Sequence, residues 1–191
     1  MYHIKEDKRS EASAALIGQA MYKLLGEKEF KHITITDLQK ESSVGRATFY
    51  RLFDRTEDVL EYLMKKQMDG FVQEYRNISS EERPPLLRYA IECYLNDYQL
   101  LEYVVRAGKI GTIFRVISKD MVWMAQLLMG DDRMKHMEHR DLEYYCALMT
   151  ASVVGVLETW LIRGKKESPE ELYEILHNHL EYSHYLYNVV Q

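Results

Sequence analysis

Apolar residues recur every three or four positions along most of the chain, which is the spacing that places them on one face of an α-helix. One such segment covers about residues 8–25. Another opens after residue 53 with acidic side chains, which the dipole at a helix amino terminus favours, and it should reach about residue 76. The helical pattern returns at residue 86 and continues to the end, with a bend expected near residues 96–97 and a helix expected around residues 121–128. Ser168-Pro169-Glu170-Glu171 should start the last helix, with an N-cap, proline at the first position and an acidic third position. We therefore predict an all-α protein.

The segment 33–53 lies between the first two long helices and predicts two short ones. Thr36 is the predicted N-cap of the first, because its hydroxyl can accept a hydrogen bond from an amide of the first turn. Gln39, three residues later, completes a capping-box pattern. Ser42 and Ser43 should end this helix, because short hydroxyl side chains compete for backbone hydrogen bonds.

The second short helix should start at residue 45 or 46 and bury Phe49 and Phe53, which are four residues apart. Val44 is the apolar residue of the intervening turn and should fill the gap between the two helices. The side chains left to point outward are basic or carry a hydroxyl: Arg46, Thr48, Tyr50 and Arg51. Two short helices, a tight turn and such an outer face describe a helix-turn-helix. The alternative is a helical hairpin in an unrelated bundle.

At these residues the chain resembles the DNA-binding signature of the TetR/AcrR family of transcriptional regulators. The resemblance rests on Ile33-Thr34-Ile35-Thr36-Asp37-Leu38, on Val44 and on Thr48-Phe49-Tyr50-Arg51-Leu52-Phe53. It extends to the apolar positions of the first helix and the residue after it, Leu16, Ile17, Ala20, Met21, Leu24, Leu25 and Phe30.

Three positions depart from the family pattern. Ser43 stands where the family usually has the turn glycine, Leu52 where a histidine is common, and Thr56 where a phosphate-binding lysine is usual. The turn can tolerate serine, but the other two changes remove expected contacts with the DNA backbone. Arg51 and Arg55 are close enough to replace them.

The resemblance implies a helix-turn-helix DNA-binding domain of three helices at residues 1–55. A helical dimerisation and effector-binding domain at residues 56–191 follows it, and the helix 56–76 joins the two. The major groove should receive the second short helix, with Arg46, Ala47 and Thr48 nearest the base edges and Tyr50 and Arg51 on phosphates. The remaining candidate DNA-binding residues are Lys5, Lys8, Arg9, Thr36 and Arg55.

The charge of the chain is compatible with a small DNA footprint. Residues 1–65 hold 11 Lys/Arg and 11 Asp/Glu, so the remainder holds 14 (25 − 11) and 19 (30 − 11), which gives the net charge of −5. This acidic balance argues against a protein that coats nucleic acid nonspecifically. A few phosphate contacts per subunit, doubled in a dimer, would suffice for a specific site.

The second half contains a long stretch without charge, residues 144–157, which also lacks a clean polar face. A helix that is apolar all round must be covered on all sides, and this stretch is too short to span a bilayer. We expect the core on one side and a second subunit on the other. The resemblance extends weakly to the dimerisation helices, at residues 155–164 and the following Ser-Pro-Glu-Glu-Leu. The predicted interface residues are Val153, Val156, Trp160, Leu176 and Leu180; a monomeric helical core is the alternative.

Aromatic residues of the second half could line an effector pocket between helices. The candidates are Tyr94, Tyr98, Tyr103, Phe114, Trp123, Tyr144 and Tyr145. The same tyrosines could equally lie half-buried at helix seams, with their hydroxyls in water.

No catalytic or cofactor motif is present. His136 and His139 are spaced like metal ligands but lie in a charged connection, and no carboxylates or thiols converge on them, so we expect neither metal nor cofactor. Cys93 and Cys146 lie in apolar helical patterns, which favours buried thiols in a reduced cytoplasm over a disulfide or a redox pair. The amino terminus is polar and does not predict a signal peptide.

The sequence thus predicts a DNA-binding transcriptional regulator that is not an enzyme. We expect a ligand-responsive repressor that binds an inverted-repeat operator as a homodimer. The alternative is a helical adaptor that keeps the DNA-binding head but responds to a protein partner. A filled core with a large exposed apolar patch would favour the adaptor.

Overall fold

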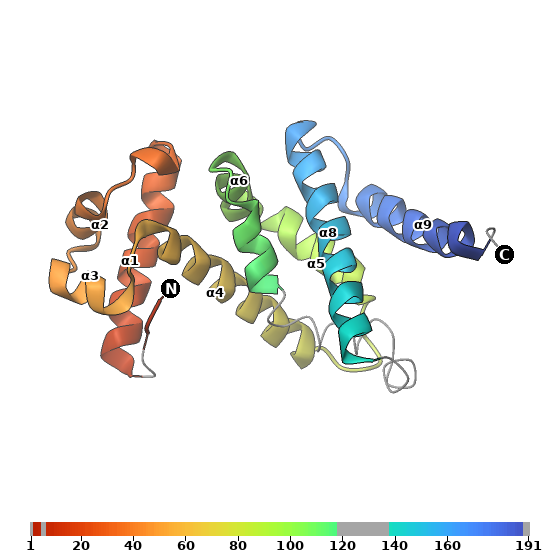
Figure 1. Ribbon diagram of the computed structural model, residues 1–191, viewed down its shortest axis with the longest axis horizontal. Helices are drawn as coiled ribbons and strands as arrows, with labels where there is room; N and C mark the ends of the chain where they lie inside the picture. Colours follow the sequence, from red (N-terminus) through yellow and green to blue (C-terminus); the bar gives the residue numbers. More distant parts are fainter. Residues whose placement is uncertain (1, 5–6, 118–137, 189–191) are drawn as a thin grey trace. The chain divides into compact units, whose positions relative to one another are not determined.

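The computed structural model describes residues 2–4, 7–117 and 138–188 (Figure 1). The described residues are helical apart from turns, loops and one isolated β-bridge between Tyr2 and Phe53, so the all-α prediction is confirmed. The chain divides into two compact units. The first contains residues 1–70 and 99–116, and the second contains residues 71–98 and 117–191.

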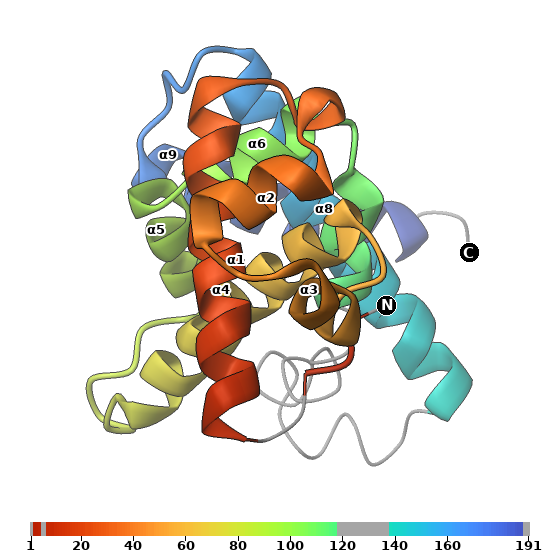
Figure 2. The ribbon, with the colours of Figure 1, turned by 90° about the vertical axis from the view of Figure 1, so that its left-hand side faces the viewer.

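The first unit begins with α1 (Lys8–Glu27), the one-turn helix η1 (Phe30–His32), α2 (Ile35–Ser42) and α3 (Arg46–Leu52). Helix α4 (Thr56–Asn77) follows and continues into the second unit. Helices α2 and α3 pack against α1 (Figure 2). Their shared core consists of fully buried side chains at helical spacing on each element: Ala14, Ile17, Met21, Leu38, Phe49, Leu52, Phe53, Val59 and Leu60. The helix pattern read from the sequence is therefore correct to within about two residues at each end.

The cap of α2 lies two residues earlier than Thr36. Thr34 is the N-cap, and its hydroxyl oxygen accepts from the Asp37 amide at 3.2 Å while the Asp37 carboxylate accepts from the Thr34 amide at 2.9 Å. The prediction of Thr36 and Gln39 was wrong because the sequence holds two overlapping cap patterns. The Asp37 carboxylate is also bound by Lys28, at 2.8 Å from its ammonium nitrogen, and this contact favours the earlier pattern.

Helix α6 (Gln99–Arg106) and a helical segment at residues 110–117 also contribute to the first unit, the latter through residue 116. The Tyr22 hydroxyl donates to the Gln99 side chain at 2.8 Å, and the Tyr22 ring meets the edge of Tyr103. Two ion pairs connect the segment after α6 to the start of α4, Lys109 with Glu57 at 3.2 Å and Arg115 with Glu61 at 3.7 Å. The bend expected near residues 96–97 is the end of α5.

The second unit contains α5 (Leu86–Asn96), α8 (His139–Ile162) and α9 (Pro169–Asn188). The described core of this unit contains Ile91 of α5, Trp160 of α8, and Leu172 and Leu176 of α9, which pack together. Helix α9 begins as the sequence predicts, since the Ser168 hydroxyl accepts from the Glu171 amide and the Glu171 carboxylate accepts from the Ser168 amide. The helix expected around residues 121–128 lies outside the described residues.

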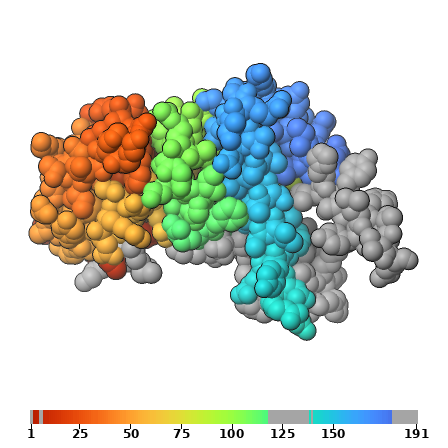
Figure 3. Space-filling model, turned by 45° about the horizontal axis from the view of Figure 1, so that its top comes forward, coloured from red at the N-terminus to blue at the C-terminus, as the bar shows by residue number. Residues whose placement is uncertain are grey.

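Helix α8 presents a long open face. The exposed positions on one side of this helix are three or four residues apart and are apolar or small: Tyr144, Leu148, Ala151, Gly155, Thr159 and Ile162. Its surface lies open in the view of Figure 3. By length and composition residues 140–162 could cross a membrane, but this is weak evidence, because core helices of soluble proteins pass the same test. Only 28% of the most apolar stretch of this helix is buried within the subunit. Its exposed face is therefore a candidate for contact with another protein surface.

Candidate DNA-binding surface

The second helix of the helix-turn-helix, α3, is anchored by its buried side. Phe49 and Leu52 are almost completely buried, and the Phe49 ring packs against Phe53 with 5.8 Å between ring centres. Because α3 has only seven residues, its direction is set by these packing contacts more than by its own stability. The buried side therefore fixes which residues face outward.

The outward side of α3 carries the residues that the sequence assigns to DNA. Arg46, Ala47, Tyr50 and Arg51 are exposed, and Thr48 is half-buried. The Arg46 guanidinium lies over the Tyr50 ring, 5.6 Å from its centre. This arrangement offers a fork of guanidinium donors, two hydroxyls and a second cation on one helix face, which are groups that bind base edges and phosphates.

The turn between α2 and α3 contains a serine in an unusual conformation. Ser43 is exposed and has φ 57° and ψ 18°, the left-handed region that favours glycine. The Ser42 hydroxyl oxygen accepts from the Val44 amide at 3.2 Å, and the Val44 side chain is buried between the helices as predicted. The turn keeps the geometry of a helix-turn-helix although serine replaces glycine.

The start of α1 carries two of the predicted DNA-binding residues. Lys8 and Arg9 are exposed in the first turn of α1, whose N-cap Asp7 accepts from the Ser10 amide at 2.9 Å. This hydrogen bond lowers the pKa of the Asp7 carboxyl, and the charge of Arg51 on α3 contributes to the same shift. Lys8 and Arg9 thus remain exposed in the first turn of a capped helix.

The other predicted DNA-binding residues lie outside α3 and outside the start of α1. Thr36 is exposed in the first turn of α2. Arg55 is exposed and lies 3.6 Å from the buried carboxylate of Asp58, at the start of α4. Lys5 lies outside the described residues.

Asp58, which was not among the predicted site residues, holds the junction between α3 and α4. Its carboxylate accepts from the amides of Asp54 and Arg55, at 2.9 and 3.2 Å. An acidic residue in the first turn of α4, after a short break from α3, is the signal that could have identified it. By binding these amides, Asp58 fixes the point where α3 ends and α4 begins.

The residues predicted to line an effector pocket are distributed over the molecule. Tyr94 is buried in the second unit near Phe71, and Tyr98 of the same unit packs on Trp160 with 5.6 Å between ring centres. Tyr103 and Phe114 belong to the first unit. Tyr144 is exposed on α8, Tyr145 is half-buried, and Trp123 lies outside the described residues. The six candidates that the structure describes are divided between the two units.

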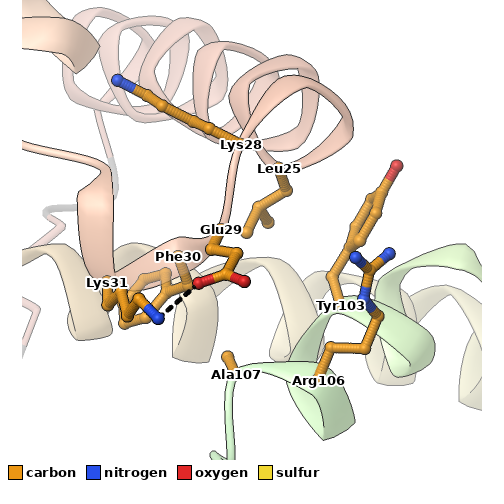
Figure 4. Close-up of a pocket in the computed structure, with 8 residues that line it drawn as sticks. All are labelled: Leu25, Lys28, Glu29, Phe30, Lys31, Tyr103, Arg106 and Ala107. Atoms are coloured by element: carbon orange, nitrogen blue, oxygen red, sulfur yellow. Dashed lines mark ion pairs between the residues drawn. The ribbon is translucent and has the colours of Figure 1, made fainter.

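A cavity of about 250 Å³ lies in the first unit, between the end of α1 and the end of α6 (Figure 4). Half of its lining residues are charged; the lining comprises Leu25, Lys28, Glu29, Phe30, Lys31, Tyr103, Arg106 and Ala107. The Lys31 ammonium pairs with Glu29 at 2.6 Å, and Lys28 is engaged by Asp37. The cavity is smaller and more charged than the mainly apolar pockets that bind drug-sized ligands.

The predicted dimer residues mostly face the core of their own subunit. Trp160 and Leu176 are buried in the core of the second unit, and the Trp160 indole N–H donates to the Glu167 carbonyl at 2.9 Å. Val156 packs against the same core, and Val153 is half-buried. The side chain of Leu180 lies outside the described residues. Because α5 and α9 use this side of α8, the side left for a partner is the exposed face described above.

Within residues 2–4, 7–117 and 138–188, no three His, Cys, Asp or Glu side chains gather as metal ligands would. Cys93 and Cys146 are not joined in a disulfide, and burial raises the pKa of both thiols.

Comparison with known proteins gives an independent view of the fold. Residues 114–182 match the TetR family model described as the C-terminal region of transcriptional regulators. No curated protein matches the chain in sequence.

Several solved structures share the whole architecture at low sequence identity. The Lin0861 protein from Listeria innocua is 18% identical, has a TM-score of 0.75 and aligns over 94% of this chain and 95% of its own. The fatty acid degradation regulator FadR from Bacillus halodurans is 18% identical, with a TM-score of 0.63 over 91% and 95%. A TetR transcriptional regulator from Streptococcus agalactiae is also 18% identical, with a TM-score of 0.58 over 90% and 94%. With a helix-turn-helix at one end and a C-terminal region that matches the family model at the other, the chain resembles TetR-family transcriptional regulators and has their fold.

Proposed function

We propose that this regulator acts as a ligand-responsive repressor in the cytoplasm and binds an inverted-repeat operator as a homodimer. The observation that carries the proposal is the outward face of α3, where Arg46, Thr48 and Tyr50 are presented by a helix whose opposite side is buried. Base contacts would specify the operator and phosphate contacts would hold the head in register.

Arg46 is the residue best suited to read a base. It is exposed in the first turn of α3, and a guanidinium can donate two hydrogen bonds to one guanine in the major groove. Arg51, Lys8 and Arg9 are exposed cations and suit phosphates. Thr36 and Arg55 would extend this set at the two ends of the helix-turn-helix.

Selection of bound DNA from a random pool tests this assignment. The wild type should enrich a sequence with two inverted half-sites about 34–36 Å apart, or a multiple of that spacing, since paired recognition helices read one face of the duplex. Arg46→Ala should relax the sequence preference, whereas Arg51→Ala should weaken binding to all sequences alike. Enrichment of no sequence by the wild type would exclude specific DNA recognition.

The exposed face of α8 supports the dimer. Leu148 and Ile162 are 67% and 75% exposed, which is high for large apolar side chains. Small residues between them, Ala151 and Gly155, would let a second helix approach closely. In a symmetric dimer the same face of the partner would cover this one, as in other helical bundles.

Control by a ligand would act through α4, which runs from the recognition head into the second unit. A ligand can shift the protein between two states only by binding them with different affinity, and a tenfold effect on operator binding needs about 1.4 kcal/mol of difference. Titration of the selected operator complex with candidate small molecules, with release followed by fluorescence anisotropy, tests this part.

The alternative is an adaptor that responds to a protein partner, and the exposed apolar face of α8 is the observation that favours it. The oligomeric state separates the two. A homodimer at micromolar concentration would occupy this face with a second copy, whereas a stable monomer would leave it for another protein.

A further inference from the structure

The amino-terminal segment pairs with the end of the recognition helix. The His3 amide donates to the carbonyl of Leu52 at 2.8 Å, and Tyr2 and Phe53 form an isolated antiparallel β-bridge. Leu52 is the last residue of α3, and the final carbonyls of a helix lack partners within the helix. The amino-terminal segment therefore supplies a hydrogen bond that α3 cannot make by itself.

The Tyr2 side chain fills the corner between α3 and α4. Its ring centre lies 6.4 Å from that of Phe53 and 6.0 Å from that of Tyr62, which meets it edge to face. Phe53 and Tyr62 also contact each other, at 5.7 Å, so the three rings form one cluster. Burial and the Glu61 carboxylate raise the pKa of the Tyr2 hydroxyl, which agrees with a position beside α4.

The His3 side chain contacts Asp54, the residue that follows Phe53. Its Nε2 atom lies 3.2 and 3.3 Å from the two carboxylate oxygens of Asp54. The Asp54 amide is bound from the other side by the buried Asp58 carboxylate. The junction of α3 and α4 is thus held between Asp58 inside and residues 2–3 outside.

We propose that Tyr2 and His3 form a strap that positions the recognition helix for DNA, Tyr2 by packing and His3 by its backbone bond to Leu52. The proposal rests on the proposed role of α3 in reading the operator. A helix of seven residues is too short to hold its own direction, and Phe49 anchors only its buried side. The strap fixes its carboxyl end, so the face that carries Arg46 and Tyr50 keeps its angle. Both strap residues are positioning residues, since neither needs to touch DNA.

Two matched pairs of variants separate the parts of the strap. Tyr2→Ala removes the ring cluster, whereas Tyr2→Phe keeps it and should restore wild-type behaviour. His3→Pro removes the N–H that binds Leu52, whereas His3→Ala keeps that N–H and removes only the imidazole. Each variant is made in the full chain, and helix content is checked by circular dichroism.

The first measurement is DNA affinity. For the operator selected by the wild type, Tyr2→Ala and His3→Pro should bind about tenfold more weakly, the loss expected when one base contact is misaligned. Affinity for DNA of unrelated sequence should stay within about twofold, because phosphate contacts tolerate a tilted helix. Equal losses on both DNAs would contradict a positioning role.

The second measurement needs no DNA. Hydrogen exchange of the Leu52 and Phe53 amides should accelerate in Tyr2→Ala and His3→Pro, with the amides in the middle of α1 unchanged. Unchanged exchange would overturn the strap, and faster exchange with wild-type operator affinity would reduce it to a structural contact. If the wild type binds no specific DNA, the proposed function fails, while exchange still decides whether the strap holds α3.

Discussion

The Arg46 guanidinium lies 5.6 Å from the centre of the Tyr50 ring, so the two outward side chains of α3 contact each other one turn apart. This contact restricts the direction of the guanidinium, and it joins the residue proposed to read bases to the one proposed to bind a phosphate. The two residues should therefore act as a pair.

A double-mutant cycle on the operator measures this coupling. Arg46→Ala and Tyr50→Ala should be non-additive by about 0.5–1 kcal/mol, the strength of an exposed cation–π contact. Arg46→Ala combined with Tyr50→Phe should be additive, because phenylalanine keeps the ring and loses only the hydroxyl. Coupling of the same size in both cycles would assign the effect to the hydroxyl instead of the ring.

Ser43→Gly should stabilise the helix-turn-helix. Serine at φ 57° carries the steric cost of a left-handed conformation, and glycine removes it at the expense of a more flexible unfolded chain. We expect a net gain of about 0.5–1 kcal/mol in the opening free energy read from hydrogen exchange of the Leu38 and Phe49 amides. Gly45→Ala is the control, because Gly45 has φ −65° and open space around it, and it should change this free energy little.

The position of the α2 cap can be tested with two threonines. Thr34→Ala should lower the free energy of unfolding of the head by about 1 kcal/mol, because it removes the cap of α2. Thr36→Ala changes an exposed residue inside the helix and should cost less than about 0.5 kcal/mol. A larger loss of stability in Thr36→Ala than in Thr34→Ala would show that Thr36 is the N-cap of α2.

Asp37 should make the stability of the head depend on pH. Hydrogen bonds from Lys28 and then from Thr34 hold the pKa of the Asp37 carboxyl well below its ordinary value of 3.8. A carboxyl with a lowered pKa in the folded state stabilises that state above pH 3.8, and the stabilisation is lost as the pH falls further. Wild type should therefore exceed Asp37→Asn in melting temperature at pH 7, and the difference should shrink below pH 3.8. If the difference in melting temperature stayed constant down to pH 2.5, the charge of Asp37 would not be its cause.

Leu148→Glu should weaken the proposed dimer. The substitution places two like charges near each other across a symmetric contact, and we expect at least about a tenfold rise in the dissociation constant measured by sedimentation. Leu16→Glu is the control, since Leu16 is an exposed leucine on α1, and it should leave the dimer intact. Val156 is a poor site for this test because it packs against the core of its own subunit. An unchanged dissociation constant in Leu148→Glu would place the contact elsewhere.

Short-range patterns in the sequence determined the helices and the recognition motif. Three- and four-residue spacing predicted α1, α3 and α4 to within about two residues, and Ser168 with Glu171 predicted the start of α9. These features depend on contacts within one or two turns of a helix, which local residues supply. The outward face of α3 followed from the same spacing, because burying Phe49 leaves Arg46 and Tyr50 outside.

Tertiary structure decided what each helix packs against. The sequence predicted Thr36 as the cap of α2, whereas Lys28, which follows α1, pairs with Asp37 and favours Thr34. Trp160 looks like an interface residue by its apolar surroundings, yet α5 and α9 enclose it within its own subunit. The contacts of Tyr2 with Phe53 and of His3 with Asp54 join residues 51 positions apart. Such pairings depend on how distant segments meet in space, and helical periodicity gives the buried face of a helix without naming its partner.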